Sequence, residues 1–443
     1  MPPPQTDAPR VCGPPTGMTI LDAGPAPDAS VCLRLLMETP VGCWFDRRAT
    51  GGTSLLMLDP LRVVRTADAV WPALPARAGA APSAPCGFAG GWAGWVAYEG
   101  GVVGMGLTPP RVAGHPQAAL GYYPACLAVD HGRGRAYAVG RGEAGRQAAE
   151  AWTRRLARAR SAAPSGAPTD PRVTGPRVLD AGPPRERFVE QVREVQRWIT
   201  YGETYVANLT YRVRLEALAD PAAAYARLAA AQLAPYAGLA RDGDHWVLSC
   251  SPELLLRRRG ARTWTRPIKG TRRAGQASGA DLAADPKERA ELTMIVDMER
   301  NDLGRVALTG SVQVTELFAV ERHPGLDHLV ATVEAVVPGA AGTLLRAMLP
   351  GGSVTGAPKY RAVERLAALE ADARGVYTGT VGHCDDGGDM EWNVAIRTLE
   401  ATPGGCLYGT GGGITSDSDP EREYQETLLK AHGPLHALGV DWP

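Results

Sequence analysis

The composition indicates a globular chain without an obvious macromolecular partner. Of its 443 residues, 44% are hydrophobic and 21% are charged, which is enough apolar material for a sizeable core. Basic and acidic residues number 47 each, so no overall field attracts nucleic acid or an anionic membrane. No apolar run approaches the ~18 residues that a membrane span needs, and residues 1–7 lack the pattern of a secretion signal. We therefore expect a cytoplasmic protein without nucleic-acid or membrane contacts, whose substrate can still be a small anion.

Cysteine and lysine usage add two expectations. The eight cysteines stand singly, without the C-x-x-C spacing suited to zinc or redox chemistry, which is typical of free thiols in a reducing compartment. Only four of the 47 basic residues are lysines, at positions 269, 287, 359 and 430. Arginine can replace most surface lysines, but not one that must lose its proton to act as a nucleophile. Each lysine is therefore a candidate for special chemistry, although an ordinary solvated side chain is the simpler interpretation of any one.

In chain order, the first 160 residues contain short apolar runs separated by Gly and Pro, which predicts strands and turns. Residues 88–98 interleave glycines with aromatic residues, a pattern that suits a strand packed closely against another backbone. Residues 161–184 are rich in Ala, Pro and Gly and form the best linker candidate.

After this linker the pattern becomes helical. Apolar residues at helical spacing predict a helix from about 188 to 202. Residues 285–288 combine an N-cap, a first-turn proline and a capping-box glutamate, and predict a second helix. Residues 418–421 open another in the same way, closed near Gly433-Pro434. A fourth helix is expected over 358–375.

Strands are expected between these helices. The ranges are 245–256, 263–268, 311–319, 328–337, 376–383 and 405–410. Helices and strands that mix without strict alternation favour an α+β fold over a parallel doubly wound sheet.

Two carboxylate pairs stand one turn apart on predicted helices: Glu288 with Glu291, and Glu423 with Glu426. Like charges at this spacing repel by ~0.2–0.5 kcal/mol. A cation bound between the two carboxylates would remove this repulsion, so such a pair is a candidate metal site. Magnesium is usually held by one or two carboxylates plus substrate oxygens and water. Each pair also has a simpler interpretation, because Glu288 can be the capping-box residue and exposed glutamate pairs are common. Lys430, on the face of the second pair, can be an ordinary salt-bridge partner.

Two glycine-rich segments follow predicted strands. Residues 409–414 let bare backbone N–H groups approach an anion, but the spacing of a dinucleotide fingerprint fails. Residues 350–359 lack the Gly-Lys-Ser/Thr ending of a phosphate loop, so we reject nucleotide binding there. Pro358 instead begins a helix whose positive N-terminus faces that loop. The residues alone therefore predict an anion site that can include magnesium.

These segments resemble, in order, the motifs of the chorismate-binding enzymes, which comprise the large subunits of anthranilate and aminodeoxychorismate synthases together with isochorismate and salicylate synthases. The matching motifs lie at 251–253, 267–272, 289–305, 328–329, 351–359, 374–379, 395–398 and 411–430. They cover essentially all of 186–432, whereas the N-terminal third matches weakly, mainly through residues 90–94 and Tyr98.

The resemblance implies a fold of two facing antiparallel β-sheets that form a sandwich, with helices packed outside. Residues 181–443 are then the chorismate-binding catalytic domain. Residues 1–180, a strand-rich segment and linker, complete the same sandwich.

The resemblance also implies a Mg²⁺ site. Glu291 and Glu426 hold the ion, Glu288 and Glu423 hold metal-bound water, and the ion contacts the ring carboxylate of chorismate. Lys430 resembles a family residue that also contacts the ring carboxylate.

The remaining implied contacts surround a substrate with two carboxylates and no phosphate. Arg397 and Tyr377 resemble the clamp on the enolpyruvyl carboxylate, where guanidinium offers a bidentate fork. Further ring-carboxylate contacts are Gly411, Gly412 and Gly413. Further pocket residues are Thr271, Thr355 and His328, the last beside the departing C4 hydroxyl.

Lys269 indicates the branch of the family. Aminodeoxychorismate synthases resemble this chain in having Pro-Ile-Lys-Gly, whereas anthranilate and isochorismate synthases usually have alanine at the lysine. The implied mechanism is covalent: neutral Lys269 attacks C2 of chorismate, and the C4 hydroxyl leaves with a proton from Glu253. Ammonia then attacks C4 and expels the lysine, which gives 4-amino-4-deoxychorismate. The site must therefore favour the neutral amine.

Two departures from the family pattern carry expectations. Relatives that add ammonia commonly have Gln or Glu where Val206 stands, and isochorismate and salicylate synthases have a lysine that activates water. With Val206, water addition at C2 is disfavoured. Residues 232–236 depart from the Asn-Pro-x-Pro-Tyr of tryptophan-inhibited relatives, so feedback inhibition by tryptophan is not expected.

The sequence contains no Gly-x-Cys-x-Gly-x-Gln segment of a class I glutamine amidotransferase. We therefore expect ammonia to come from a separate amidotransferase subunit, or from free ammonium in the test tube. Two alternatives stay open: anthranilate or aminodeoxyisochorismate formation, since Val206 is unusual, and a non-catalytic chorismate-binding regulator. Glu253 argues against the regulator, because a pure binder has no need of a proton donor. Supply of 4-aminobenzoate to folate and supply to an antibiotic are equally compatible with these residues.

Overall fold

The computed structural model describes residues 17–79, 83–109, 115–161, 175–273, 279–323 and 326–443, except for the side chains of 271–273, 279–280, 322–323 and 326. Most of the expected linker, residues 162–174, lies outside the described residues, as does the proline-rich segment before residue 17.

The described strands form two antiparallel sheets, the larger of twelve strands and the smaller of ten. The larger contains β1 (Met18–Pro25), β8 (Arg135–Arg141), β7 (Ala125–Asp130), β3 (Thr53–Leu58), β2 (Val41–Asp46), β11 (Tyr236–Asp242), β12 (His245–Ser251), β21 (Thr398–Thr402), β22 (Gly405–Ile414), β10 (Val206–Leu215), β18 (Gly356–Ala357) and, beside β10, β9 (Val178–Asp180). The smaller contains β15 (Ile268–Arg273), β17 (Leu326–Val336), β14 (Arg262–Arg266), β13 (Leu254–Arg259), β20 (Met390–Asn393), β19 (Thr380–Asp385), β5 (Gly91–Val96), β6 (Ala118–Tyr123), β4 (Arg62–Val64) and, beside β17, β16 (Gln313–His323).

The two sheets face each other across an apolar layer. Phe45 on β2, Trp95 on β5 and Val381 on β19 belong to one buried cluster with residues from both sheets, and the Phe45 ring meets His383 of the smaller sheet at 5.2 Å. This is the sandwich that the sequence resemblance implied, and the expected α+β class is confirmed.

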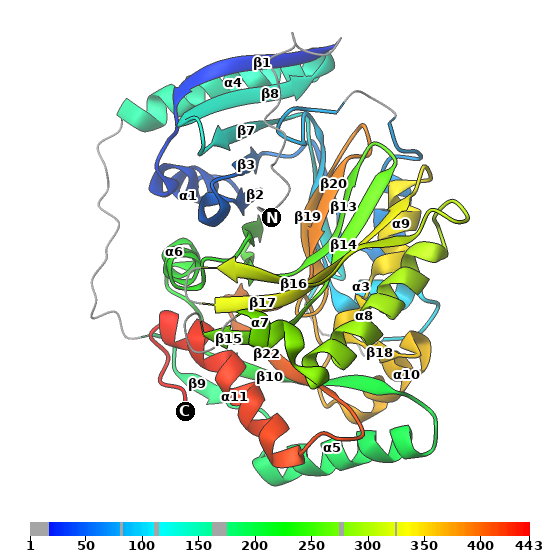
Figure 1. Ribbon diagram of the computed structural model, residues 1–443. Coiled ribbons are helices and arrows are strands. Elements are labelled where there is room, and N and C mark those ends of the chain that lie inside the picture. The colour runs from blue at the N-terminus through cyan, green and yellow to red at the C-terminus, as the bar shows by residue number, and fades with distance from the viewer. Residues whose placement is uncertain (1–16, 80–82, 110–114, 162–174, 274–278, 324–325) are drawn as a thin grey trace.

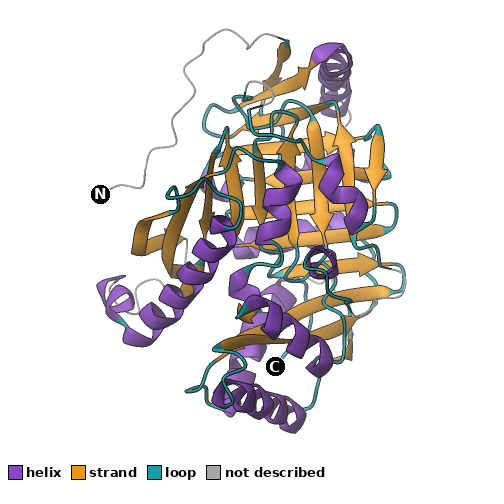
Figure 2. Cartoon of the chain, turned by 90° about the vertical axis from the view of Figure 1, so that its right-hand side faces the viewer, coloured by secondary structure: helices purple, strands orange, loops and turns teal. Residues whose placement is uncertain are grey.

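Helices cover the outer faces of the sandwich (Figures 1 and 2). The helices are α1 (Ala29–Met37), α2 (Ala67–Ala73), α3 (Tyr98–Gly104), α4 (Gly142–Ser161), α5 (Arg185–Thr200), α6 (Pro221–Gln232), α7 (Gly279–Ala284), α8 (Pro286–Gly304), α9 (Ala341–Met348), α10 (Lys359–Leu369) and α11 (Pro420–Ala437). A second cluster buries α1, α4, α5, α6, α10 and α11 against the larger sheet. A third buries α2, α8 and α9 against the smaller sheet. In the described part of the chain, no helix combines the length and apolar character required to cross a membrane.

N-terminal strands are integral to both sheets. β2 pairs with β11, with Phe45 opposite Gly238, and β5 pairs with β19, with Trp95 opposite Val381. The glycines of β5 have a packing reason: Gly94 has φ +148°, and a Cβ there would lie 1.9 Å from the carbonyl oxygen of Ala119. The glycine–aromatic pattern at 88–98 therefore marks a close backbone approach, as expected.

Two helices begin where the capping residues predict, whereas two helices end at residues other than those predicted. The Asp285 side chain accepts hydrogen bonds from Lys287 and Glu288 N–H, and Asp419 caps α11 in the same way. The fourth helix ends at Leu369 rather than 375. The expected stop at Gly433-Pro434 is wrong, because α11 continues to Ala437 and buries Leu435 in the core.

Two strand expectations also need correction. The stretch 245–256 is two strands, β12 and β13, that lie in different sheets and are separated at Pro252-Glu253. The glycine-rich residues 409–414 are not a loop after a strand but the second half of β22. Over this half only β10 is paired, since β21 reaches no further than Tyr408. The glycines therefore still leave one backbone edge free of sheet partners.

Candidate active site

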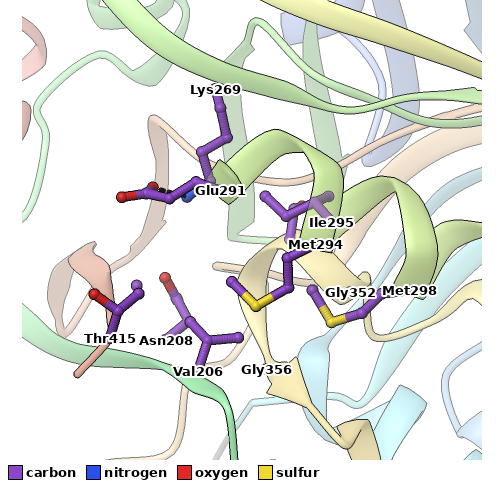
Figure 3. A pocket seen from close by; sticks show the side chains of 12 residues that line it. Val206, Asn208, Lys269, Glu291, Met294, Ile295, Met298, Gly352, Gly356 and Thr415 are labelled. Carbon is purple, nitrogen blue, oxygen red and sulfur yellow. Dashed lines mark ion pairs between the residues drawn. The ribbon is translucent and has the colours of Figure 1, made fainter. Parts of the chain in front are cut away.

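A narrow pocket opens where both sheets meet α8 (Figure 3). Val206 and Asn208 enter it from β10, Lys269 from β15 and Glu291 from α8, while Gly413 belongs to the end of β22. The pocket therefore collects residues that are more than two hundred positions apart in sequence.

A bulge in β15 brings Lys269 to this pocket. The register against β17 shifts between Lys269 and Thr271, and Gly270 between them has φ +61°. This left-handed backbone conformation favours glycine, and a Cβ at Gly270 would lie 2.9 Å from Glu288 Oε2 on α8, so the strand passes close to the helix here. Lys269 Nζ then lies 3.7 Å from Glu291 Oε2, and its side chain is 24% exposed. This amine has an electrostatic partner, but the separation is too long for a hydrogen bond.

Glu253 is the buried carboxyl beside this amine. It connects β12 to β13 and is 5% exposed. Burial raises the pKa of Glu253 to about 7, against the opposing charge of Lys269. A carboxyl with this pKa can donate a proton near neutral pH.

The two predicted carboxylate pairs occupy neighbouring helix faces. Burial and the charge of Glu291 raise the pKa of Glu288, and burial with the charge of Glu426 raises that of Glu423. Lys287 of α8 acts electrostatically on both pairs, so the two helices present their carboxylates to a common space.

This arrangement fits a hard divalent cation. Four carboxylates share the space with lysine ammonium groups, and burial together with the neighbouring carboxylate raises the pKa of Glu288 and of Glu423. Oxygen-rich sites of this kind suit magnesium. Glu288, Glu291, Glu423 and Glu426 are thus the residues that could hold it.

The glycines of β22 lie directly under α11. A Cβ at Gly412 would be 3.2 Å from Glu423 Oε2 and 3.7 Å from Lys430 Nζ. Lys430 Nζ donates to the Gly411 carbonyl at 3.1 Å and pairs with Glu426 at 2.8 Å. The structure therefore brings Lys430, both α11 glutamates and these glycines together.

Tyr377 and Arg397 flank Tyr408 beside the same strand. A Cβ at Gly409 would lie 2.1 Å from the Tyr377 ring, so the ring packs flat on the glycine backbone. Arg397 is a non-glycine residue with φ +51°, and burial lowers its pKa. Backbone strain of this kind is often found where a side chain must be aimed at a ligand.

The remaining predicted residues surround the pocket less directly. His328 is 3% exposed on β17, and its backbone lies opposite Thr271, whose side chain is outside the described atoms. The Thr355 hydroxyl donates to the Gly351 carbonyl at 2.8 Å, and the Thr355 carbonyl accepts from Asn208 N–H. Of the predicted set, Lys269, Glu291 and Gly413 line the pocket itself.

Several supporting residues were missed from the sequence. Met294 and Met298 line the pocket one and two turns after Glu291 on α8, a spacing that could have signalled them. Lys359 is not solvated: it contacts Asp302 at the end of α8 and donates to the Pro350 carbonyl at 2.7 Å.

Arg374 is a second structural cation behind the pocket. Its guanidinium donates to the Val354 and Asn208 carbonyls at 2.7 Å each and pairs with Glu370. It also lies 4.5 Å from the centre of the Tyr98 ring. Arg374 therefore fixes two walls of the pocket relative to each other.

Residues 44–436 match the family described as chorismate binding enzyme. The chain is 43% identical over 262 residues to the aminodeoxychorismate synthase component 1 of Salmonella typhimurium, which covers 57% of this chain and 58% of that protein. It is 40% identical over 331 residues to the Klebsiella aerogenes protein of the same name, which covers 73% and 71%. The chain thus spans less than two thirds of the first relative.

A solved structure gives the same assignment for the fold. The anthranilate synthase component I of Streptococcus pneumoniae superposes with a TM-score of 0.73 and 27% identity, covering 97% of this chain and 94% of that one. The matched region includes the pocket, its lysine and both carboxylate pairs. This protein therefore belongs to the chorismate-binding enzyme family.

Proposed function

We propose that this chain converts chorismate and ammonia to 4-amino-4-deoxychorismate and water through a covalent adduct on Lys269. The observation that carries the proposal is the position of Lys269 Nζ in the pocket, 3.7 Å from Glu291 and without a short hydrogen bond to it. An amine in this position is not committed to a tight ion pair, and its nitrogen can approach a substrate bound in the pocket.

In the first step, the neutral amine of Lys269 forms a bond to C2 of chorismate. The ring double bonds shift and the bond between C4 and its hydroxyl breaks. Glu253, buried and with a pKa raised by burial to about 7, supplies the proton that lets the hydroxyl leave as water. The protonated adduct nitrogen then returns a proton to Glu253.

In the second step, ammonia forms a bond to C4. The double bonds shift back, the bond from C2 to Lys269 breaks, and an ammonia proton ends on the released lysine. Chorismate and ammonia are thus converted to aminodeoxychorismate and water, with the protein groups restored.

Recognition of the two substrate carboxylates is proposed at two separate groups of residues. Glu291 and Glu426, supported by Glu288 and Glu423, would hold a magnesium ion, which supplies a positive charge for the ring carboxylate. Lys430 and the β22 glycines lie beside these glutamates. Arg397 and Tyr377 would hold the enolpyruvyl carboxylate.

Ammonia is proposed to come from a separate class I glutamine amidotransferase subunit, in the cytoplasm. The name component 1 of the similar proteins supports a two-component enzyme. The described cysteines are free thiols, which supports a reducing compartment.

The test is product analysis with the purified chain, chorismate, Mg²⁺ and excess ammonium. We expect a product in which an amino group replaces the C4 hydroxyl and the enolpyruvyl group is retained, and which an added lyase converts to 4-aminobenzoate. Without ammonium, intact-protein mass spectrometry should show an adduct of chorismate minus water on wild type and none on Lys269→Ala. Undiminished turnover of Lys269→Ala would overturn the covalent mechanism.

Anthranilate formation is the second candidate. The similarity to an anthranilate synthase component I over 97% of the chain favours it. Val206 in the pocket also favours it, because an apolar side chain does not direct ammonia to one particular ring carbon. Anthranilate is fluorescent and has lost pyruvate, so the same assay separates the two. A chorismate-binding regulator would make neither product.

A further inference from the structure

A cluster of two histidines and one glutamate lies apart from the pocket carboxylates. His115 stands three residues before β6, His245 begins β12 and Glu400 lies in β21. One ligand atom from each of these residues lies within 4.8 Å of the others. The cluster brings together segments of both sheets. His115 precedes β6 of the smaller sheet, whereas His245 and Glu400 lie in strands of the larger sheet.

The register of the larger sheet explains the meeting of His245 and Glu400. Glu400 is directly opposite Val247 on the neighbouring strand. His245, two residues before Val247, points to the same face and is the diagonal neighbour of Glu400. His115 reaches this face from the segment that precedes β6 of the other sheet, and its ring meets that of His245 edge-on at 5.3 Å.

The distances suit a shared metal ion better than strong hydrogen bonds. His115 Nδ1 forms a long hydrogen bond of 3.3 Å with Glu400 Oε2, and His245 Nε2 lies 3.4 Å from the same oxygen. Charge-assisted hydrogen bonds are usually about 2.7–2.9 Å long. Two ligand atoms bound tetrahedrally to zinc at about 2.0–2.1 Å are about 3.3 Å apart.

The histidine nitrogen that faces the cluster is buried and has no hydrogen-bond partner. His245 is 9% exposed, and Nε2 is not aligned for a hydrogen bond to Glu400. His115 is partly exposed, which leaves room for its ring to rotate and for an ion to enter. A buried nitrogen that faces a carboxylate without a hydrogen bond needs an explanation, and a role as a metal ligand supplies one.

The opposite oxygen of Glu400 is already oriented. Glu400 Oε1 accepts from Val376 N–H at 2.8 Å and from Arg212 at 3.1 Å. Ligating carboxylates in metal sites are characteristically held by such outer hydrogen bonds.

Local charge leaves room for a cation. Glu99 and Glu400 are both buried and share the field of Arg212. Arg374, the next guanidinium, is paired with Glu370.

We propose that His115, His245 and Glu400 bind one divalent transition-metal ion, with zinc the best chemical match, independently of the magnesium proposed for catalysis. Two imidazoles and one carboxylate are a borderline ligand set that favours zinc over magnesium. The ion fastens the two sheets behind residues 375–377, the segment that carries Tyr377 and is held by Glu400.

The test is zinc uptake by the full untagged chain in excess Mg²⁺, which occupies the pocket carboxylates. After equilibration with Zn²⁺ and desalting, elemental analysis should find one zinc per wild-type chain, and Co²⁺ in its place should give the visible spectrum of a low-coordinate site. His115→Ala and His245→Ala should each weaken binding at least ~100-fold, since loss of an outer hydrogen bond alone costs about 10–100-fold. Zinc should raise the thermal unfolding midpoint of wild type and of neither variant.

The matched control is the other histidine pair that could bind zinc. His432 and His436 are exposed on α11, with stacked rings 5.7 Å apart, and His432→Ala should keep the wild-type zinc content. His115→Ala alters a partly exposed residue, so it provides a folded variant if His245→Ala does not fold. Absence of stoichiometric uptake by wild type, or uptake that His432→Ala abolishes and His115→Ala retains, would overturn the proposal and leave a hydrogen-bonded cluster.

Discussion

Two lysines near the two ends of α8 are held in opposite ways. Lys269 Nζ has a carboxylate at 3.7 Å and is 24% exposed. Lys359 is 12% exposed, contacts Asp302 and donates to the Pro350 carbonyl at 2.7 Å. Both were candidates because lysine is rare in this chain. The difference indicates that the tightness of the amine's partners, rather than its burial or scarcity, distinguishes the proposed nucleophile from a structural cation.

Removing the loosely held amine should have the largest effect. Lys269→Ala should abolish the chorismate adduct and lower turnover by roughly 10³-fold or more, since no other group can supply the nucleophile. Lys269→Arg keeps the charge but not the nucleophile and should fail equally. Intact-mass spectrometry and product assays measure both, and full activity of the arginine variant would mean that only the charge matters.

Removing the tightly held amine should instead damage the fold. Lys359→Ala removes the ion-pair partner of Asp302, which is 3% exposed. Loss of one partner from a buried pair costs about 3–5 kcal/mol of unfolding free energy. Denaturant unfolding checks this, with Lys359→Met plus Asp302→Asn as a partial rescue. A change below about 1 kcal/mol would show that the pair is effectively solvated.

The same contrast explains what could be predicted from the sequence. Glu288, Glu291 and Lys269 belong to short motifs, so local spacing and family resemblance found them. The partnership of Asp302 with Lys359 links residues 57 positions apart, and no local pattern marks it. Only the packing of α8 against residues 350–359 brings them together.

The wrongly predicted end of α11 has the same physical reason. Helix starts depend on capping side chains within three residues, and those at Asp285 and Asp419 were correct. The end of α11 depends on tertiary contacts, because burial of Leu435 and Leu438 in the core outweighs the helix-breaking tendency of Gly433-Pro434. The cluster of His115, His245 and Glu400 is a further case, since sheet register rather than sequence spacing creates it.

The pH profile of adduct formation tests the acid that serves Lys269. With the pKa of Glu253 raised by burial to about 7, the carboxyl is protonated below that pH and ionised above it. The rate of adduct formation should therefore stop rising at about pH 7, because further loss of the proton from Glu253 cancels any gain in the neutral attacking amine. Rapid-quench mass spectrometry without ammonia measures this step and avoids the titration of ammonia itself. A rate that keeps rising to about pH 9 would assign the proton to another group.

Replacement of Lys287 should have the smallest effect of these changes. Lys287 can be compared directly with Lys269, because both approach the carboxylate of Glu291. Its Nζ lies 3.9 Å from Glu291, but its side chain is 68% exposed. Lys287→Ala should change the unfolding free energy by no more than about 0.5 kcal/mol and should still form the adduct. Since Lys287 also opposes the charges of Glu288 and Glu423, its removal should lower the half-saturating Mg²⁺ concentration by about two- to threefold at low salt, and less at high salt. A higher Mg²⁺ requirement in this variant would mean that the two glutamate pairs are not the magnesium site, because removal of a competing cation cannot weaken a site built from those carboxylates.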